Sequence, residues 1–259
     1  MLNHYRDGSG DALLLIHGIG SRWQVWMPVL DRLAAERTVI ALDLPGFGES
    51  PLPAAGLPPG VASLTRLVLE FIDQLGLDRP HVAGNSLGGQ IALELAKTGR
   101  VRSANALSPA GFHEGAETRF QKLSLQLTLK AARLLAPVTD TVLARPLGRR
   151  LVFAQMAARP DRMTAAEGAD NVRGVADSRW FEATLDAMLA EPFTGGEQIE
   201  VPVTIAWGEK DHLLLPRQAA RAARALPAAK SVTLHGCGHV PTYDDPDQVA
   251  CVLLEGSRA

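Results

Sequence analysis

The sequence predicts an α/β protein in which helices flank a mainly parallel sheet. Short apolar runs of strand length alternate with longer amphipathic segments of helix length. The runs are rich in Val, Ile and Leu and do not alternate with polar residues, which is typical of strands buried on both faces. The alternation stops over residues 111–196, where prolines separate helix-like stretches. This interruption predicts a helical insertion in the sheet-forming part of the chain.

Six strands are expected from the short apolar runs. The first reads Ala-Leu-Leu-Leu-Ile, which is long enough for a buried strand and too short for a helix. Five further runs of similar character follow it along the chain. The six predicted strands are Ala12–Ile16, Thr38–Leu42, His81–Ala83, Val101–Leu107, Val203–Trp207 and Ser231–Leu234.

Five helices are expected between and after these strands. Their apolar residues recur every three or four positions, so each helix has one face suited to a core. In the second helix, for example, Leu64, Val68 and Phe71 fall on one face. The predicted helices are Trp23–Ala35, Val61–Leu75, Leu87–Lys97, Arg217–Leu226 and Pro246–Leu254.

The insertion divides the chain into two predicted parts. Residues 1–110 and 197–259 are expected to form the α/β core domain, and residues 111–196 a helical cap subdomain. An insertion of this length is too long for a plain loop. We therefore expect the cap to shape a substrate pocket beside the sheet.

The first part of the predicted cap has an unusual composition. Residues 111–160 contain eight Lys or Arg but only three acids, which favours either an anionic substrate or a solvated helix face. The solvated face is the preferred interpretation. Six leucines are expected to form cap core and pocket wall rather than a membrane anchor. A role as a lid over acyl chains is kept as an alternative. The six leucines are Leu123, Leu125, Leu127, Leu129, Leu134 and Leu135.

The overall composition is that of a soluble globular protein. The chain is 46% hydrophobic and 21% charged, with 26 Lys and Arg against 28 Asp and Glu. No excess of cations is available to neutralise phosphates, so nucleic acid is not an expected partner. Cys237 and Cys251 are too few for a disulfide scaffold and favour a reduced, cytoplasmic setting, although one bridge is arithmetically possible. The N-terminal residues lack a signal-peptide core and no long apolar run occurs, so stable membrane insertion is not expected.

The segment that carries the chemistry is residues 84–89, Gly-Asn-Ser-Leu-Gly-Gly. It follows a predicted strand and opens a predicted helix, which is the context of a G-x-S-x-G nucleophile elbow. The sharp turn pushes the hydroxyl of Ser86 above the sheet edge, and Gly84 and Gly88 leave room for neighbouring backbone. The N-terminus of the following helix directs free N–H groups at a developing oxyanion.

With this elbow the chain resembles the α/β-hydrolase family. Residues 13–20, Leu-Leu-Leu-Ile-His-Gly-Ile-Gly, are similar to the family's strand and H-G-x-G oxyanion loop, and residues 43–50 to its D-x-P-G-x-G-x-S turn. The resemblance implies the α/β-hydrolase fold and an oxyanion hole made by the backbone N–H groups of Ile19 and Leu87. It also implies that His17 braces the loop and that the turn is structural.

A serine nucleophile needs a base that is oriented by an acid. In the family these residues follow the serine in the order acid, then histidine. A predicted strand leads into Gly-Glu-Lys-Asp at residues 208–211, which matches the acid position, and Gly238-His239 matches the base position. The resemblance therefore implies a catalytic triad of Ser86, Asp211 and His239.

Other residues near these positions have weaker claims. His212 adjoins the acid and points elsewhere, His235 is expected to be structural, and Glu209 is expected at the surface. His235, Cys237 and His239 have metal-ligand side chains, but glycines separate them and no fourth ligand is obvious, so no metal is expected. No cofactor is expected either, because no strand is followed by G-x-G-x-x-G.

These residues predict a serine hydrolase that cleaves a carboxylic ester of a small or medium-sized substrate through an acyl-enzyme. Ser86 rather than Asp at the nucleophile position argues against epoxide hydrolase and haloalkane dehalogenase chemistry. The elbow is also similar to that of carbon–carbon bond hydrolases of meta-cleavage pathways, but Ser21 and Val240 stand where those enzymes have other residues. A non-catalytic ligand receptor on the same fold is a third alternative. The expected partner is a small-molecule ester or related acyl substrate.

Overall fold

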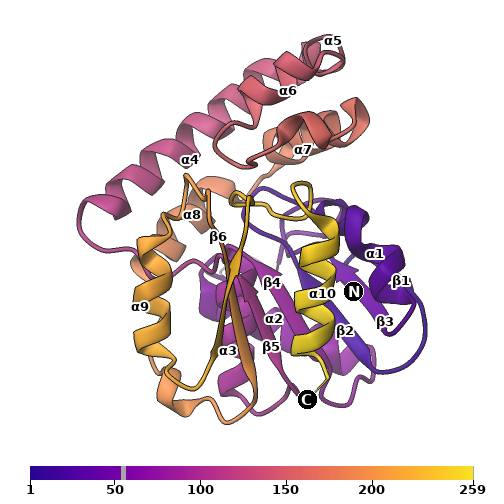
Figure 1. Ribbon diagram of the computed structural model, residues 1–259, viewed down its shortest axis with the longest axis vertical. Helices are drawn as coiled ribbons and strands as arrows, with labels where there is room; N and C mark the ends of the chain where they lie inside the picture. The colour runs from indigo at the N-terminus through magenta and orange to yellow at the C-terminus, as the bar shows by residue number, and fades with distance from the viewer. Residues whose placement is uncertain (54–56, 259) are drawn as a thin grey trace.

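A seven-stranded sheet runs through the centre of the computed structural model, which describes residues 1–53 and 57–258 (Figure 1). The strand order is β1-β3-β2-β4-β5-β6-β7. β1 pairs antiparallel with β3, and the other neighbours pair parallel. The strands are β1 His4–Asp7, β2 Ala12–Ile16, β3 Thr38–Leu42, β4 His81–Asn85, β5 Ala104–Leu107, β6 Val203–Gly208 and β7 Lys230–Leu234.

The strand order creates a switch point beside β2. The chain passes from β2 to β3 on one side and then returns to place β4 on the other side of β2. In open parallel sheets, ligands bind outside the carboxyl ends of the strands at such a point. The loops that follow β2 and β4 are the two that the sequence associates with an oxyanion hole and a nucleophile.

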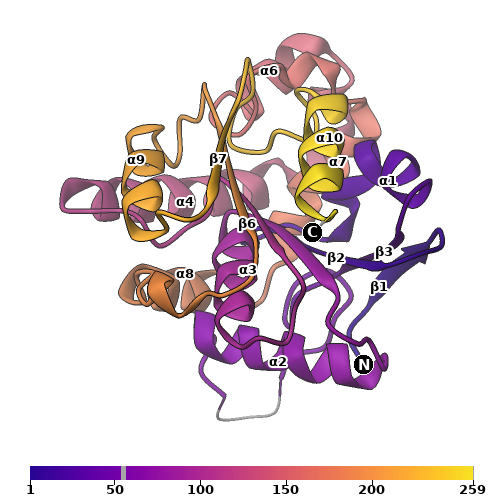
Figure 2. The same ribbon diagram turned by 60° about the horizontal axis from the view of Figure 1, so that its bottom comes forward.

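Helices cover both faces of the sheet (Figure 2). The alternating residues of β2 show why: Leu14 and Ile16 join one apolar cluster, and Leu13 and Leu15 join the other. The first cluster includes residues of α2, α3 and α9, and the second includes residues of α1 and α10. These helices are α1 Met27–Ala34, α2 Val61–Gln74, α3 Leu87–Lys97, α9 Arg217–Ala225 and α10 Pro246–Gly256.

The six predicted strands and five predicted helices are present, with shifts at their ends. β5 begins at Ala104 rather than Val101, because Ala104 is the first residue there that pairs with both β4 and β6. The predicted helix Trp23–Ala35 is divided into a 3₁₀ turn, Trp23–Trp26, and α1. β1 was not predicted, since His-Tyr-Arg-Asp is too polar to resemble a buried strand; it lies at the edge of the sheet.

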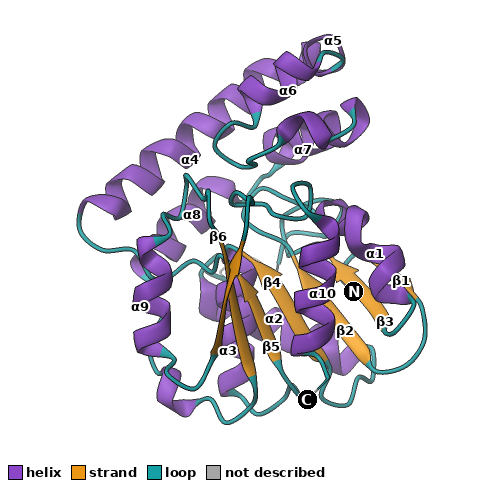
Figure 3. Cartoon of the chain, viewed as in Figure 1, coloured by secondary structure: helices purple, strands orange, loops and turns teal. Residues whose placement is uncertain are grey.

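The segment between β5 and β6 is helical (Figure 3). α4 and α7 pack together over the carboxyl end of the sheet, while α8 packs against α2 and α4. The division into core 1–110 and 197–259 and cap 111–196 stays a prediction, and "cap" is used below for residues 111–196. Its helices are α4 Ala116–Leu135, α5 Thr139–Leu143, α6 Pro146–Val152, α7 Ala165–Asp177 and α8 Phe181–Ala190. Within residues 1–53 and 57–258, no helix combines the length and apolar character that crossing a bilayer requires.

Candidate active site

Ser86 lies in the sharp turn between β4 and α3 with a strained backbone. Its φ is 57° and its ψ is −116°, a region that residues other than glycine rarely adopt. A Cβ on Gly84 would lie 2.0 Å from the carbonyl oxygen of Gly88, and a Cβ on Gly88 would lie 2.1 Å from that of Ile16. Both glycines are therefore required by close backbone packing. The turn places Ser86 on the wall of a cavity, as a nucleophile elbow demands.

Two backbone N–H groups beside Ser86 are available to a ligand. Leu87 is the first residue of α3, so its N–H has no partner within the helix. Ile19 lies in the loop after β2, which lines the same cavity as Ser86. Among the described residues, neither N–H donates a hydrogen bond to another residue. This arrangement matches the donors expected of an oxyanion hole.

His17 is buried and holds the oxyanion loop against the following turn. Its Nε2 accepts a hydrogen bond from the backbone N–H of Leu44 at 2.8 Å, so the ring proton sits on Nδ1 and is donated to the carbonyl of Gly18 at 2.7 Å. Burial lowers the pKa of His17, although the nearby carboxylate of Asp43 opposes the shift. Both nitrogens are occupied, so His17 has no lone pair left to act as a base.

Asp211 and His239 form a buried pair. Nδ1 of His239 lies 2.8 Å from Oδ2 of Asp211, and the two side chains are 3% and 0% exposed. Oδ1 of Asp211 accepts the backbone N–H groups of Leu213 and Leu214 at 2.9 and 2.8 Å. The carboxylate is thus fixed by two donors and orients the imidazole so that Nε2 remains free to take a proton. His239 lines the same cavity as Ser86.

Asn85 is a positioning residue that the sequence analysis did not identify. Its side-chain amide donates to the backbone carbonyl of His239 at 2.9 Å and to that of Leu107 at 3.1 Å. The residue next to Ser86 therefore holds the loop of His239. Its position inside the elbow motif was the only signal in the sequence, since its partner lies 154 residues away.

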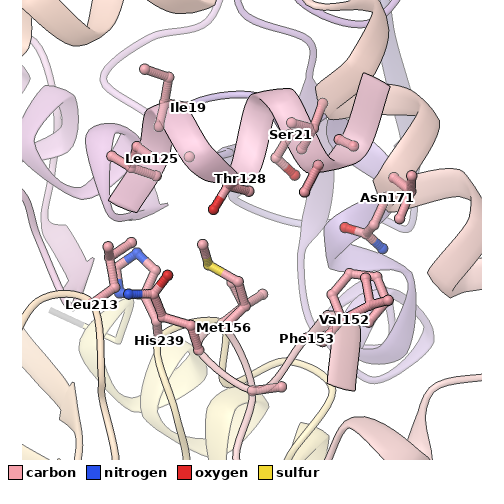
Figure 4. Close-up of a pocket in the computed structure, with 18 of the residues that line it drawn as sticks. Ile19, Ser21, Leu125, Thr128, Val152, Phe153, Met156, Asn171, Leu213 and His239 are labelled. Atoms are coloured by element: carbon pink, nitrogen blue, oxygen red, sulfur yellow. The ribbon is translucent and has the colours of Figure 1, made fainter. Parts of the chain in front are cut away.

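The cavity is about 520 Å³ in volume and lies between the carboxyl end of the sheet and the cap (Figure 4). Ile19, Ser86 and His239 contribute to the core side, and side chains of α4, α6 and α7 contribute to the cap side. Most of the lining is apolar. Polar side chains at the wall include Ser124, Thr128, Gln155, Asn171 and Tyr243. None of the eight basic residues of segment 111–160 lines the cavity, which favours the solvated-face interpretation of that charge.

The remaining candidates lie away from the cavity. His212 and Glu209 are exposed. His235 was expected to be structural, but its side chain is exposed and lies 3.8 Å from Glu209. Cys237 is buried and free, with a pKa raised to about 12 by burial, while Cys251 is exposed and free. Within the described part of the chain, no group of three His, Cys, Asp or Glu residues is arranged to hold a metal ion.

Asp244, which the sequence analysis also missed, connects the cap to the loop of His239. Its buried carboxylate accepts the backbone N–H groups of Ala158 and Arg159 in the cap, at 3.0 and 2.6 Å, and of Gly238 at 2.7 Å. A Cβ on Gly238 would lie 2.8 Å from the backbone nitrogen of Ala158, so the two segments touch directly. One carboxylate therefore sets the spacing between the cap and the loop of His239.

We expect Asp244→Asn to destabilise the protein by about 2–4 kcal/mol, because the amide nitrogen would face an N–H donor in a buried site. Calorimetry should show a thermal midpoint lowered by about 5–10 °C. The control is Asp245→Asn. Asp245 caps α10 through the N–H of Gln248, and asparagine caps equally well. Equal midpoints for both variants would show that the Asp244 contacts contribute little.

Comparisons with known proteins agree with this architecture. A family model described as "Alpha/beta hydrolase family" matches residues 13–250. The dihydrolipoyllysine-residue acetyltransferase component of the acetoin cleaving system of Cupriavidus necator is 31% identical; the match covers 96% of this chain but only 64% of that protein. Lipase 1 of Psychrobacter immobilis is 28% identical, over 93% of this chain and 75% of the lipase. The crystal structure of a membrane phospholipase A, a bacterial virulence factor, superposes with a TM-score of 0.76 at 27% identity, over 98% and 82% of the two chains.

The family model, the strand order and the elbow at the switch point lead to one assignment. The family model spans the chain from β2 into the first half of α10. The mostly parallel seven-stranded sheet with helices on both faces confirms the predicted fold class. The chain belongs to the alpha/beta hydrolase family.

Proposed function

We propose that this protein is a serine hydrolase that cleaves a carboxylic ester of a small or medium-sized substrate through an acyl-enzyme. The observation that carries the proposal is that two features line the same apolar cavity. The first is Ser86 in its strained turn, and the second is His239 with its buried partner Asp211. A hydroxyl of ordinary pKa becomes a nucleophile only when a base of this kind is nearby.

In the proposed reaction, the hydroxyl oxygen of Ser86 attacks the ester carbonyl carbon while Nε2 of His239 takes its proton. The charge that develops on the carbonyl oxygen is stabilised by the N–H groups of Ile19 and Leu87. Asp211 stabilises the imidazolium, which then protonates the leaving alcohol. Water, activated by the same histidine, releases the acid and restores the serine.

The cavity supports an uncharged acyl group rather than an anionic one. Its lining is dominated by apolar side chains of the cap, including Leu125, Leu135 and Phe153, and contains no Lys or Arg. A carboxylate buried there would lose its hydration without gaining a counter-charge. The apolar lining also disfavours the alternative reaction, which is cleavage of a carbon–carbon bond in a meta-cleavage dienone. That substrate is an anion.

The comparisons support ester chemistry. Two similar proteins are named as a lipase and a phospholipase, and both names denote hydrolysis of esters. An epoxide hydrolase of Mycobacterium tuberculosis is also similar, at 29% identity over 69% of this chain. Epoxide hydrolases of this family use a carboxylate nucleophile, and Ser86 occupies that position here.

The test is a substrate screen with the purified protein. We expect turnover of p-nitrophenyl esters and covalent labelling of Ser86 by a fluorophosphonate probe, read by peptide mass spectrometry. A meta-cleavage dienone is included as the competing substrate. Faster turnover of the dienone than of every ester would favour carbon–carbon bond hydrolysis. No labelling of the folded protein would favour a non-catalytic receptor.

A further inference from the structure

The cap exposes apolar side chains in an organised pattern. Ten large apolar side chains are exposed among the described residues, and six of them lie on two helices, α4 and α6. We call these six the cap stripe. They are Phe120, Leu123, Leu127 and Leu134 of α4 and Leu147 and Leu151 of α6.

The cap stripe follows helical spacing. On α4, successive members are three, four and seven residues apart, and on α6 they are four apart, so each set lies along one face of its helix. Leu134 and Leu151 are 80% and 72% exposed. The opposite side of α4 is buried through Leu125 and Leu129. α4 therefore has two apolar faces, and the residues that the structure describes cover only one of them.

The cap stripe reaches the mouth of the cavity. Leu127 and Leu151 are exposed to solvent and also line the cavity, so each helix contributes one side chain of the cap stripe to the cavity wall. In Figure 1, α4, α5 and α6 form the outer edge of the molecule, on the side away from the sheet. A surface that contacts Leu127 and Leu151 would therefore lie beside the wall of the cavity.

Unneutralised positive charge accompanies the cap stripe. Arg119, Lys130 and Arg133 are exposed on α4, and Arg145 is exposed just before α6; none makes an ion pair with a described residue. Four acidic groups of the cap are already paired with cations. Lys122 binds Asp186, Arg150 binds Asp161, Arg173 binds Asp140, and Arg217 and Arg221 bind the buried Glu117.

We propose that the cap stripe docks on the surface of a membrane that contains anionic phospholipids. Helices with one exposed apolar face and flanking cations lie in the interface of such membranes, with the apolar side chains among the acyl chains and the cations near the headgroups. Leu127 and Leu151 would then place the mouth of the cavity against the lipid. The alternative occupant is a second copy of this chain. A two-fold contact through the cap stripe would bring the unpaired cations of both copies together, which disfavours it.

The test measures binding alone and so does not depend on the proposed function. Full-length protein is sedimented with unilamellar vesicles of phosphatidylcholine, with or without about one third phosphatidylglycerol. We expect binding to the anionic vesicles that is about tenfold stronger than to the neutral ones and weakens in high salt. The double variant Leu123→Gln/Leu134→Gln, whose residues do not line the cavity, should bind about tenfold less.

The chain offers a matched control. Met27 and Leu52 are also exposed, at 50% and 41%, but lie outside the cap, so Met27→Gln/Leu52→Gln should bind like the parent protein. A second variant, Arg119→Gln/Lys130→Gln/Arg133→Gln, should lose the preference for anionic vesicles. Equal thermal midpoints verify that the variants are folded.

Three results would overturn the proposal. One is the absence of binding to both kinds of vesicle. Another is undiminished binding by Leu123→Gln/Leu134→Gln. The third is a concentration-dependent dimer in sedimentation velocity that this variant abolishes while vesicle binding is absent, which would identify the second copy as the occupant.

Discussion

Replacing Ser86 with alanine is expected to lower kcat for ester hydrolysis by a factor on the order of 10⁵ to 10⁶. The hydroxyl is the proposed attacking atom, and no water held at the same place would match its alignment with His239 and the oxyanion donors. Alanine fits the same space, so the fold should remain intact. Steady-state kinetics with a p-nitrophenyl ester and circular dichroism provide the two measurements. Labelling by the fluorophosphonate probe should disappear as well.

Ser124 provides the matched control for this change. It is another of the serines on the wall of the cavity, but its hydroxyl donates to Gln155 at 2.6 Å. Ser124→Ala should therefore keep kcat within a few-fold of the parent value and retain probe labelling. Full turnover in Ser86→Ala, or loss of labelling only in Ser124→Ala, would show that the nucleophile has been assigned to the wrong residue.

Asp211→Asn is expected to lower kcat by about 10⁴-fold while leaving KM nearly unchanged. The backbone N–H groups of Leu213 and Leu214 require an acceptor, so the amide oxygen of the asparagine would face them. Its NH₂ group would then face Nδ1 of His239 and force the ring proton onto Nε2. In that tautomer the histidine cannot take the proton of Ser86.

Glu209→Gln serves as the control for Asp211→Asn. Glu209 is an exposed acid in the same loop, and among the described residues its carboxylate accepts a hydrogen bond only from the N–H of Gly236, at 2.9 Å. This change should alter kcat less than about threefold, since the side chain lies outside the cavity. The assignment of the acid would be contradicted by comparable losses in the two variants.

The sequence was sufficient for the parts of the molecule that depend on local pattern. Buried parallel strands are continuous apolar runs, so β2, β3 and β6 were evident, and the family membership that they and the elbow suggested is confirmed by the family model. β1 was not predicted, because an edge strand has few buried residues and needs little apolar character. The residues proposed for catalysis fall at the ends of such strands, where a turn motif marks them.

The residues that the sequence did not reveal are those whose role depends on partners far away in the chain. Asn85 acts through the backbone of His239, and Asp244 acts through Ala158 and Arg159 of the cap. Neither contact follows any periodicity, and an aspartate in a loop resembles any other surface acid. Leu123, Leu127 and Leu134 were expected to form cap core and pocket wall, and only the packing of α4 reveals that their side chains are exposed.

The Asp244 bridge has a consequence for protein engineering. Side chains of the cap line the cavity, so exchanging residues 111–196 for those of a relative would change this lining. Here Ala157 and Ala158 of the cap pack on Gly238, and Val240 donates its N–H to the carbonyl of Met156 at 2.7 Å. A transplanted cap that differs at this strip would displace the histidine loop, however well its helices fit. A successful chimera must therefore take residues 156–159 and 238–244 from the same parent protein.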